Sequence, residues 1–494
     1  MKSVTSVRWR RGALSRSALS FGLLTALSGC MVGPNFHPPR ANVPQNYLTS
    51  PTSQGRDYVS GGAVDPQWWN SFNDPVLTQL ETTAVAQNLD LQIATQRLFA
   101  AEAQAQMQGA VLYPSLGGSI LYNRSKLSDN SPLGLMSPPA ANAANLYQYG
   151  LQAIFDLDLW GKNKRIVEAA VSNARASEEA RRAALLNVEA SVASNYIQLR
   201  GTEAVLGITQ KSLESAKQLV QLTQEREFAG LTTQLDVANA KATAAQISSQ
   251  IPTLIARRDA LIEQIGLLLG QTPDSLPQDL VTPAPVPLTP PVVPVGLPST
   301  LLTRRPDVRE ALDTLHAATA QIGAAKADFF PDISLSATTS LQSVHFDSLN
   351  EWKSLAYSFG PNITLPIFQG GMLRGQLKLT EANEKVAAIS YAKTVLTAFT
   401  QVDTALVTYA QEHDTQTALQ TDVEQSQIAL GLAEEQYKQG LVDYLTVLTA
   451  QQAYLSAQQD LAMSLQSLGM DLVTLYQALG GGWQQLYPVE AKQG

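Results

Sequence analysis

Cysteine is almost absent from the sequence, because Cys30 is the only one among 494 residues. A single cysteine excludes an intrachain disulfide and any metal site that is built from several cysteines. Histidine is also scarce, and its positions show no ligand spacing such as HExxH. The four histidines are His37, His316, His345 and His413. A nucleophile elbow and a phosphate-binding loop are missing too, since Gly480-Gly481-Gly482 follows a helical stretch as a helix stop does. We therefore expect no catalytic residue, no metal and no cofactor.

Aromatic residues make up only 7% of the chain, whereas alanine and glutamine are abundant. This composition suits helices packed through small side chains better than one large apolar core. The net charge is −8, and both signs are mixed along the helical stretches. A nucleic-acid partner is therefore not indicated.

No apolar run near the N-terminus is long enough to span a bilayer, since the run from Ala18 to Leu27 is too short. This run follows five basic residues, so residues 1–29 are predicted to be a signal peptide. Leu27-Ser28-Gly29-Cys30 resembles the bacterial lipoprotein signal, in which the cysteine becomes the acylated first residue, carrying for example palmitate. Met31, which is not an aspartate, favours the outer membrane in such lipoproteins. The alternative is a buried or incidental Cys30.

One long stretch without proline runs from Gln369 to Leu479, and its strong break signal is Lys438-Gln439-Gly440. Its apolar residues step by three and four, which places a seam on one side of each helix. Examples are Val395, Phe399, Val402, Leu406 and Tyr409. A helix from Gly371 to Gln439 would be about 100 Å long at roughly 1.5 Å per residue. We expect a helical hairpin over about 370–479 with its tip near residue 440.

Four other segments alternate with a period of two, which predicts strands with one apolar and one polar face. Each is about ten residues long, the length that crosses a bilayer when the strand is tilted. The strands are expected at about 115–124, 146–157, 332–343 and 354–366. A helix is expected before them from about Val76 to Gly109, with Asp74 as its N-cap.

The two halves of the chain repeat the order helix, strand, loop, strand, long helix, tight turn, long helix. Tyr113-Pro114 corresponds to Phe330-Pro331, and Gly230 corresponds to Gly440. The first repeat is expected at 67–272, with a helical hairpin at about 161–270 and its tip near 230, and the second at 299–483.

Three further segments complete the expected organisation. Residues 30–66 are predicted to be a lipid-anchored, extended N-terminal segment. Residues 273–298 contain nine prolines and are predicted to be an extended linker. Residues 484–494 form a C-terminal tail.

The four strands are too few for a closed barrel of useful bore. In lipid every backbone group must be paired inside the structure, so the chain must pool its strands with other copies. Three copies would give twelve strands, and two would give eight with a plugged interior. The alternative is a soluble sheet lying on the helices, against which stand the aromatic bands on one face and the export signal.

Several motifs along the mature chain together resemble the TolC-type outer-membrane efflux factors, specifically their lipoprotein branch. The motifs are Cys30-Met31-Val32-Gly33-Pro34, Trp68-Trp69 with Phe72-Asn73-Asp74-Pro75, Arg304-Arg305-Pro306-Asp307-Val308-Arg309, Phe329-Phe330-Pro331, Pro366-Ile367-Phe368-Gln369-Gly370-Gly371, Tyr437 with Gly440 and Tyr444-Leu445-Thr446-Val447-Leu448, and Ala478-Leu479-Gly480-Gly481-Gly482-Trp483. The resemblance implies an α+β membrane protein: a homotrimer with a twelve-stranded transmembrane β-barrel, four strands per chain, continued by a periplasmic α-helical barrel. It also implies that this tunnel docks on a periplasmic adaptor and an inner-membrane RND-type transporter and conducts drugs, toxic compounds or metal ions passively to the exterior.

The resemblance also places an adaptor contact at the two hairpin tips, Gly230-Leu231-Thr232 and Gly440-Leu441-Val442. The glycines also supply the backbone freedom of a turn, and the apolar residues would form an exposed rim. A periplasmic gate is implied at Leu445, and Thr449 stands where family members often carry an acidic residue. Asp236 and Asp443 either line the mouth or act as solvated helix-cap carboxylates.

Two other functions remain compatible with this pattern. One is the outer-membrane channel of a type I protein or peptide secretion system, which has the same architecture. The other is a surface-anchored helical scaffold without a pore.

Overall fold

The computed structural model describes residues 31–40, 44, 47, 58–128, 130–132, 143–290 and 292–485. The chain divides into two compact units, and each combines segments that are far apart in the sequence. The first, here the sheet unit, contains Phe99–Ala176, Leu312–Ser390 and the described residues up to Pro39. The second, here the helical unit, is built from Arg40–Leu98, Ser177–Ala311 and Tyr391–Gly494. Both units therefore cut across the two sequence repeats.

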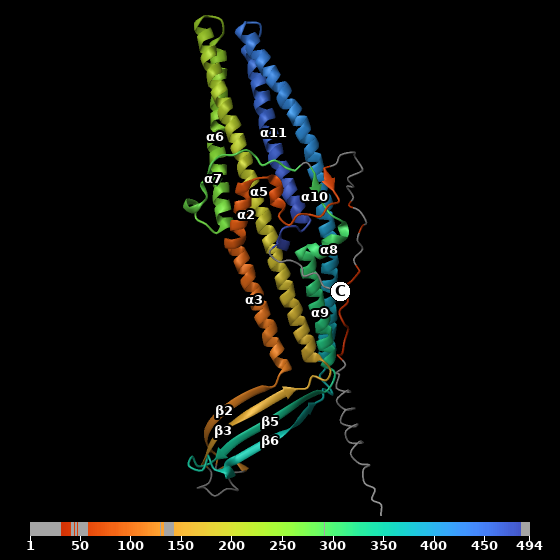
Figure 1. The fold of residues 1–494 in the computed structure, drawn as a ribbon. Helices are drawn as coiled ribbons and strands as arrows, with labels where there is room; N and C mark the ends of the chain where they lie inside the picture. The colour runs from red at the N-terminus through yellow and green to blue at the C-terminus, as the bar shows by residue number, and fades with distance from the viewer. Residues whose placement is uncertain are drawn as a thin grey trace, which may run out of the picture. The chain divides into compact units, whose positions relative to one another are not determined.

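The sheet unit contains one antiparallel sheet of four strands in the order β2-β3-β5-β6 (Figure 1). The strands are β2 (Ser115–Lys126), β3 (Ala143–Asp156), β5 (Asp332–Ser343) and β6 (Leu355–Thr364). All four expected strands are present, with ends shifted by three residues or fewer. Pairing β3 with β5 joins the hairpin of the first half to the hairpin of the second half.

Long helices form most of the remaining structure, and their bounds follow the expected breaks. They are α2 (Pro75–Gln87), α3 (Leu89–Gly109), α5 (Lys162–Phe228), α6 (Gln234–Leu269), α9 (Pro306–Ala327), α10 (Met372–Lys438) and α11 (Tyr444–Ala478), with the single turn α8 (Leu301–Arg304) before α9. The helix α6 continues across Pro252. Among the described helices, none is both long enough and apolar enough to cross a membrane.

The expected single helix from Val76 to Gly109 is wrong, because Asn88 interrupts it. The Asn88 side-chain oxygen accepts from the Leu91 amide at 2.9 Å, which caps α3, and its amide nitrogen donates to the Leu268 carbonyl at 2.8 Å. One asparagine thus ends a helix, starts the next and ties both to the end of α6. The expected N-cap is confirmed, since Asp74 accepts from the Val76 and Leu77 amides.

The proline-rich segment 273–298 is not an uninterrupted extended linker. It contains the single-turn elements η4 (Pro273–Ser275) and α7 (Gln278–Val281), and the short strand β4 (Val293–Pro294). The strand β4 pairs in parallel with β1 (Val59–Ser60), and the Val293 amide donates to the Tyr58 carbonyl at 2.9 Å. This backbone pairing holds part of the segment against the strand β1, and the Val293 side chain is buried.

Two buried tryptophans hold the ends of the helical unit together. Trp68 is fully buried and stacks on Tyr476 of α11 at 5.2 Å between ring centres. The Trp483 indole nitrogen donates to the Arg304 carbonyl at 2.9 Å, and the guanidinium groups of Arg182 and Arg309 lie 5.0 and 5.3 Å from its ring. These ring contacts stabilise the packing of the two tryptophans against the helices through burial and cation–π attraction.

The motif Arg304-Arg305-Pro306-Asp307 fastens the end of α11 to the start of α9. Arg305 forms an ion pair with Asp307 at 2.7 Å and donates to the Ala478 carbonyl at 2.9 Å. A cation at a helix C-terminus satisfies a carbonyl that has no partner within the helix. The motif is therefore structural in this chain.

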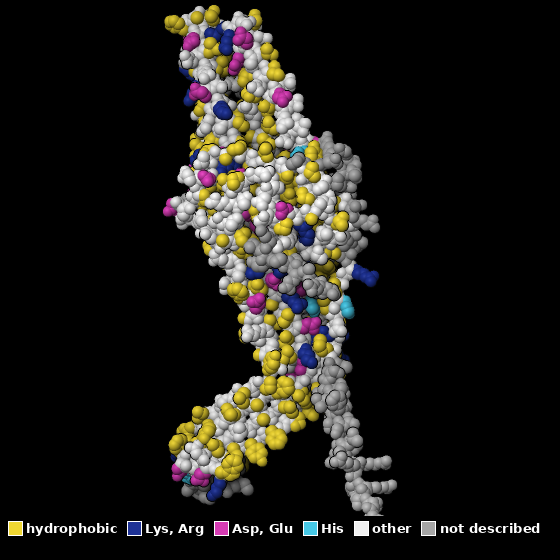
Figure 2. Space-filling view, viewed as in Figure 1, with side chains coloured by type: hydrophobic (Ala, Val, Ile, Leu, Met, Phe, Trp, Pro, Cys, Tyr) yellow, Lys and Arg dark blue, Asp and Glu magenta, His cyan; other side chains and the backbone are white. Residues whose placement is uncertain are grey.

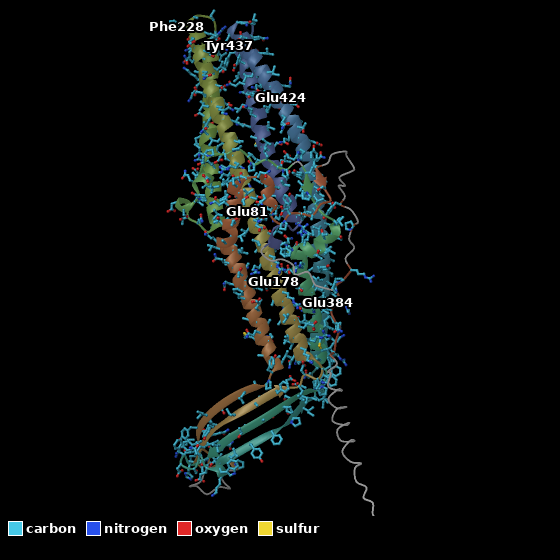
Figure 3. All side chains as sticks on the ribbon, in the orientation of Figure 1. Glu81, Glu178, Phe228, Glu384, Glu424 and Tyr437 are labelled. Atoms are coloured by element: carbon cyan, nitrogen blue, oxygen red, sulfur yellow. The ribbon has the colours of Figure 1, made fainter. Side chains whose placement is uncertain are left out.

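Glu81 on α2 (Figure 3) and Glu189 on α5 are two of the buried carboxyl groups of the helical unit. Burial raises the pKa of Glu189 to about 8. Burial, and then the neighbouring Glu189, raise the pKa of Glu81 well above its ordinary value. An apolar environment disfavours the charged form of a carboxyl, so both groups retain protons at a pH where exposed glutamates have lost them.

The pair predicts a helical unit that loses stability as the pH rises. Between the ordinary pKa of 4.5 and about 8 the unfolded chain loses the Glu189 proton while the folded chain keeps it, at about 1.4 kcal/mol per pKa unit. Thermal unfolding of the detergent-solubilised protein should therefore show a midpoint several degrees lower at pH 8 than at pH 5. Glu189→Gln should remove much of this difference by raising the midpoint at pH 8.

Glu178→Gln is the matched control, because Glu178 lies on the same helix with its carboxylate partly exposed and paired with Arg182. It should leave the pH dependence unchanged. An equal effect of Glu189→Gln at pH 5 and pH 8 would contradict the assignment.

Candidate functional site: the sheet faces and the two hairpin turns

The strand register places most of the large apolar residues of the four strands on one common face. Directly paired residues of an antiparallel sheet point to the same side, and side chains alternate along each strand. This apolar face contains Leu116, Ile120, Tyr122, Tyr147, Tyr149, Leu151, Phe155, Ile333, Leu335, Leu341, Leu355, Tyr357, Phe359 and Ile363. Several are almost fully exposed, including Ile120 at 90%. Figure 2 shows hydrophobic side chains along the sheet, with the charged ones gathered at its loop end.

The opposite, polar face carries mostly small and hydrogen-bonding side chains, with Leu121, Leu146 and Ile154 as apolar exceptions. It contains Ser115, Gly117, Ser119, Asn123, Gln148, Gln152, Ser334, Ser336, Thr338, Ser340, Gln342, Ser358, Asn362 and Thr364. The charged residues that the register places on this face are Asp156 and Asp332, both at the end where the strands meet the helices. Nearby, Lys162 forms an ion pair with Asp328 at 2.6 Å. Such a face suits contact with water or with dissolved ions.

Aromatic side chains lie at both ends of the sheet. At the loop end the Tyr147 ring lies 4.9 Å from Tyr122 and 5.5 Å from Phe346. At the helix end Trp160 stacks on Phe330 at 4.7 Å, and its indole nitrogen donates to the Pro331 carbonyl. Two aromatic bands that flank an apolar band are typical of strands crossing a membrane.

The two hairpin turns have the same backbone design. Gly230 and Gly440 have φ of 74° and 77°, and each follows the last turn of a 67-residue helix. The Leu231 amide donates to the Arg226 carbonyl, and the Leu441 amide donates to the Gln436 carbonyl. Each helix thus ends at a residue in the left-handed backbone conformation, for which glycine is preferred because it has no Cβ.

The exposed residues of the turns are those predicted from the sequence, with one exception. Leu231 and Leu441 are 66% and 70% exposed, while Thr232 is half-buried. Val442 was expected on the exposed rim, but it packs against a buried cluster between the hairpins instead. That cluster consists of Leu219, Ala240, Ala433, Tyr437, Tyr444 and Val447. Phe228, which the sequence reasoning missed, is 95% exposed beside the first turn (Figure 3).

Both aspartates near the turns cap helices. Thr233 and Asp236 form a reciprocal capping box at the start of α6, and the Thr232 hydroxyl donates to Asp236 at 2.6 Å. Asp443 caps α11 by accepting from the Thr446 amide at 3.0 Å. These hydrogen bonds, from Thr232 and Thr446 respectively, lower the pKa of both carboxyls, so each remains charged.

The other two expected gate residues are exposed on the first turns of α11. Leu445 presents its side chain to the surface, and the Thr449 hydroxyl donates to the Leu445 carbonyl at 2.9 Å. The two therefore stand one turn apart on one helix face. Leu235, at the corresponding place on α6, is exposed to a similar degree.

One arginine links the two hairpins beside their turns. Arg226 of α5 places its guanidinium 4.6 Å from the Tyr437 ring of α10 and donates to the Lys438 carbonyl at 3.2 Å. Tyr437 in turn lies edge-on to Tyr444 of α11 at 6.0 Å. Sequence reasoning missed this clamp, because it joins residues that are about two hundred positions apart.

Cys30 lies outside the described residues, but the segment that follows it is held on the sheet unit. The Val32 amide donates to the Trp160 carbonyl at 3.0 Å, and Asn35 accepts from Arg165 at 2.6 Å. Phe36 stacks on His316 at 4.4 Å. Among the residues that the structure describes, no group of three or more His, Cys, Asp or Glu side chains could hold a metal ion.

The sequence matches the family model described as outer membrane efflux protein, over residues 80–271 and 297–481. It is 34% identical to the solvent efflux pump outer membrane protein SrpC of Pseudomonas putida, covering 95% of this chain and 98% of that one. It is 31% identical to the cation efflux system protein CusC of Escherichia coli, over 94% of this chain and 99% of the relative.

Solved structures of outer-membrane channels share the fold. The outer-membrane channel OprN superposes with a TM-score of 0.85 at 30% identity, covering 92% of this chain and all of that one. The CmeC outer-membrane channel of Campylobacter jejuni superposes with a TM-score of 0.85 at 25% identity, over 92% and 95% of the two chains.

Proposed function

Because the chain belongs to the outer membrane efflux protein family, we propose that three copies join their sheets into a twelve-stranded barrel in the outer membrane and their hairpins into a tube. The chain is an outer-membrane exit duct of an efflux pump and not an enzyme. We propose that the tube is lined by the helical hairpins and that it receives cargo from a periplasmic adaptor and an inner-membrane RND-type transporter.

The sheet is the observation that carries this proposal. Its order leaves β2 and β6 as edge strands within the described part of the chain, and its apolar face has exposed side chains on all four strands. Unpaired strand edges are not tolerated in lipid, so closure must come from other copies. Three copies supply twelve strands and leave an open bore, whereas two would give a plugged barrel.

The cargo is proposed to be small molecules, as the names of the relatives suggest for solvents and cations. The polar face of the sheet carries short, uncharged side chains over most of its length, which favours a passive duct without a substrate site. Drugs, toxic compounds and metal ions would all fit such a duct. The alternative is a type I secretion channel for proteins or peptides.

We assign the adaptor contact to the turns, at Gly230, Leu231 and Thr232 and at Gly440, Leu441 and Val442. The exposed leucines support this assignment, since exposed apolar rims tend to be contacts. Val442 would contribute by fixing the second turn on the buried cluster. The proposed anchors in the outer membrane are the sheet and an acyl group on Cys30.

The proposed gate lies just inside the turns and opens when the hairpins splay apart. Leu445 supplies an apolar ring and Thr449 a ring of hydroxyls, while Asp236 and Asp443 stiffen the helix starts as caps. Arg226 holds the two hairpins of one chain together. We propose that adaptor binding releases this clamp.

The function is tested by reconstituting the purified protein in planar bilayers and by deleting its gene. A duct gives stable conductance steps, a native mass of three copies, and greater sensitivity of the deletion strain to toxic small molecules. A scaffold without a pore gives no conductance. Conductance together with unchanged sensitivity and loss of a secreted protein would support the secretion alternative instead.

The gate assignment predicts the effects of two substitutions. Thr449→Cys should form disulfide cross-links between copies in the resting state, because three such residues would meet at the constriction. Leu445→Ala should raise the resting leak conductance several-fold by widening the apolar ring. Absence of cross-links together with an unchanged leak in Leu445→Ala would show that the gate lies elsewhere.

Removing the clamp should also raise the resting conductance. Arg226→Ala loses both the ring contact and the hydrogen bond to the Lys438 carbonyl, an interaction worth about 1–3 kcal/mol. Single-channel recordings should therefore show a several-fold longer open time. Arg258→Ala is the control, because Arg258 pairs with the adjacent Asp259 on α6. If both variants behave as the unmodified protein, the clamp does not bias the gate.

The carboxylates of the polar face predict a preference for cations. Three copies would place Asp156 and Asp332 as six negative charges at the helix end of the bore, where they attract cations. Asp332→Asn combined with Asp156→Asn should lower the cation-to-anion permeability ratio, measured from reversal potentials in a salt gradient. Asp347→Asn removes the same charge in the loop after β5 and should have little effect. A ratio unchanged in the double variant would contradict this ring.

A further inference from the structure

The loop between β5 and β6 folds back over the loop end of the apolar face. The Tyr149 hydroxyl donates to Asn350 at 2.6 Å, and the Tyr147 ring lies edge-on to Phe346. The Ser343 and Ser348 hydroxyls lie 2.7 Å apart. Because Tyr147, Tyr149 and Ser343 all belong to the apolar face, the loop lies on that side of the sheet.

A groove remains between this loop and the sheet. Its volume is about 820 Å³, which is within the size range of ligand pockets. Its walls are Ile120, Leu151, Leu341 and Leu355 from the four strands, and Trp352 from the loop. Ile120 is 90% exposed and Trp352 is 85% exposed, so the apolar walls have few protein contacts of their own.

The polar groups at the groove are few. The Tyr149 hydroxyl and the Asn350 side-chain oxygen bond to each other, Thr339 adds a hydroxyl on the same face, and Glu351 is the charged lining residue. The other polar lining residues, Ser119 and Ser340, belong to the opposite face of the sheet by the register. A hydrophilic cargo molecule would find few hydrogen-bond partners here. A hydrocarbon chain would instead supply dispersion contacts that the apolar walls lack when the groove is empty. The groove is also continuous with the exposed apolar face that meets the membrane.

We propose that this groove holds one acyl chain of an outer-leaflet lipid, clamped between the strands and Trp352. The assignment rests on the proposed function, because it requires the apolar face to meet lipid and the loop end to lie at the outer surface. The bound chain would fix the loop at the mouth of the duct. Trp352 suits this place, since tryptophan combines an apolar ring with a polar nitrogen at membrane interfaces.

The test uses a phosphatidylethanolamine with a photoactivatable diazirine on its acyl chain. The full chain is reconstituted in vesicles with a small fraction of this lipid, and the adducts are mapped by peptide mass spectrometry. Adduct yields near Ile120, Leu151 and Trp352 should exceed several-fold those at Phe359 and Ile363. These two lie on the same face outside the groove and are comparably exposed.

Two variants separate a bound chain from general lipid contact. Thr339→Phe places a ring in the groove and should reduce the groove adducts several-fold, leaving those at Phe359 unchanged. Ala153→Phe adds the same ring to the same face outside the groove and should change neither set. Trp352→Ala removes one wall and should also lower the groove adducts.

The outcomes distinguish failure of the groove assignment from failure of the proposed lipid-facing barrel. Adducts that follow exposure alone and do not respond to Thr339→Phe would overturn the groove assignment while leaving the barrel intact. Adducts at neither set would overturn the lipid-facing arrangement and the groove with it. Normal conductance of the variants shows that they are folded.

Discussion

Backbone hydrogen bonding in lipid is the constraint on which the other features depend. A strand edge cannot remain unpaired there, because no water replaces the missing partner. Among the described residues, the sheet pairs β3 with β5 and so joins the two halves internally, while β2 and β6 lie at its edges. This constraint is why we propose that several copies join their sheets, since four strands leave two edges to be paired.

Much of the fold was predictable because it depends on local pattern. The alternation of apolar and polar residues located all four strands, and the glycine signals located both turns, at Gly230 and Gly440. The interruption at Asn88 was missed because the periodicity continues through it, and its reason is a hydrogen bond to Leu268 at the end of another helix. Local patterns cannot reveal such a partner.

The candidate site was only partly predictable for the same reason. The exposed leucines of the turns follow from the glycine that ends each helix, which the sequence indicates. Val442 is partly buried because it packs against a cluster from four helices, which the sequence does not indicate. The pairing of β4 with β1 likewise joins segments that are both rich in proline and far apart. Composition indicated extended chain for each, but it could not indicate that the two extended pieces would pair.

The two turns share one backbone design, which would constrain the proposed gate. At the start of α6 the cap is Thr233 with Asp236 three residues later, and at the start of α11 it is Asp443 with Thr446 three residues later. The two hairpins thus use the same pair of residue types in opposite order. Since each carboxylate is already engaged by amide and hydroxyl donors, neither is free to join the hairpins to each other. Arg226, whose planar guanidinium reaches both a ring and a backbone carbonyl of the other hairpin, is a polar contact through which the two turns can be coupled.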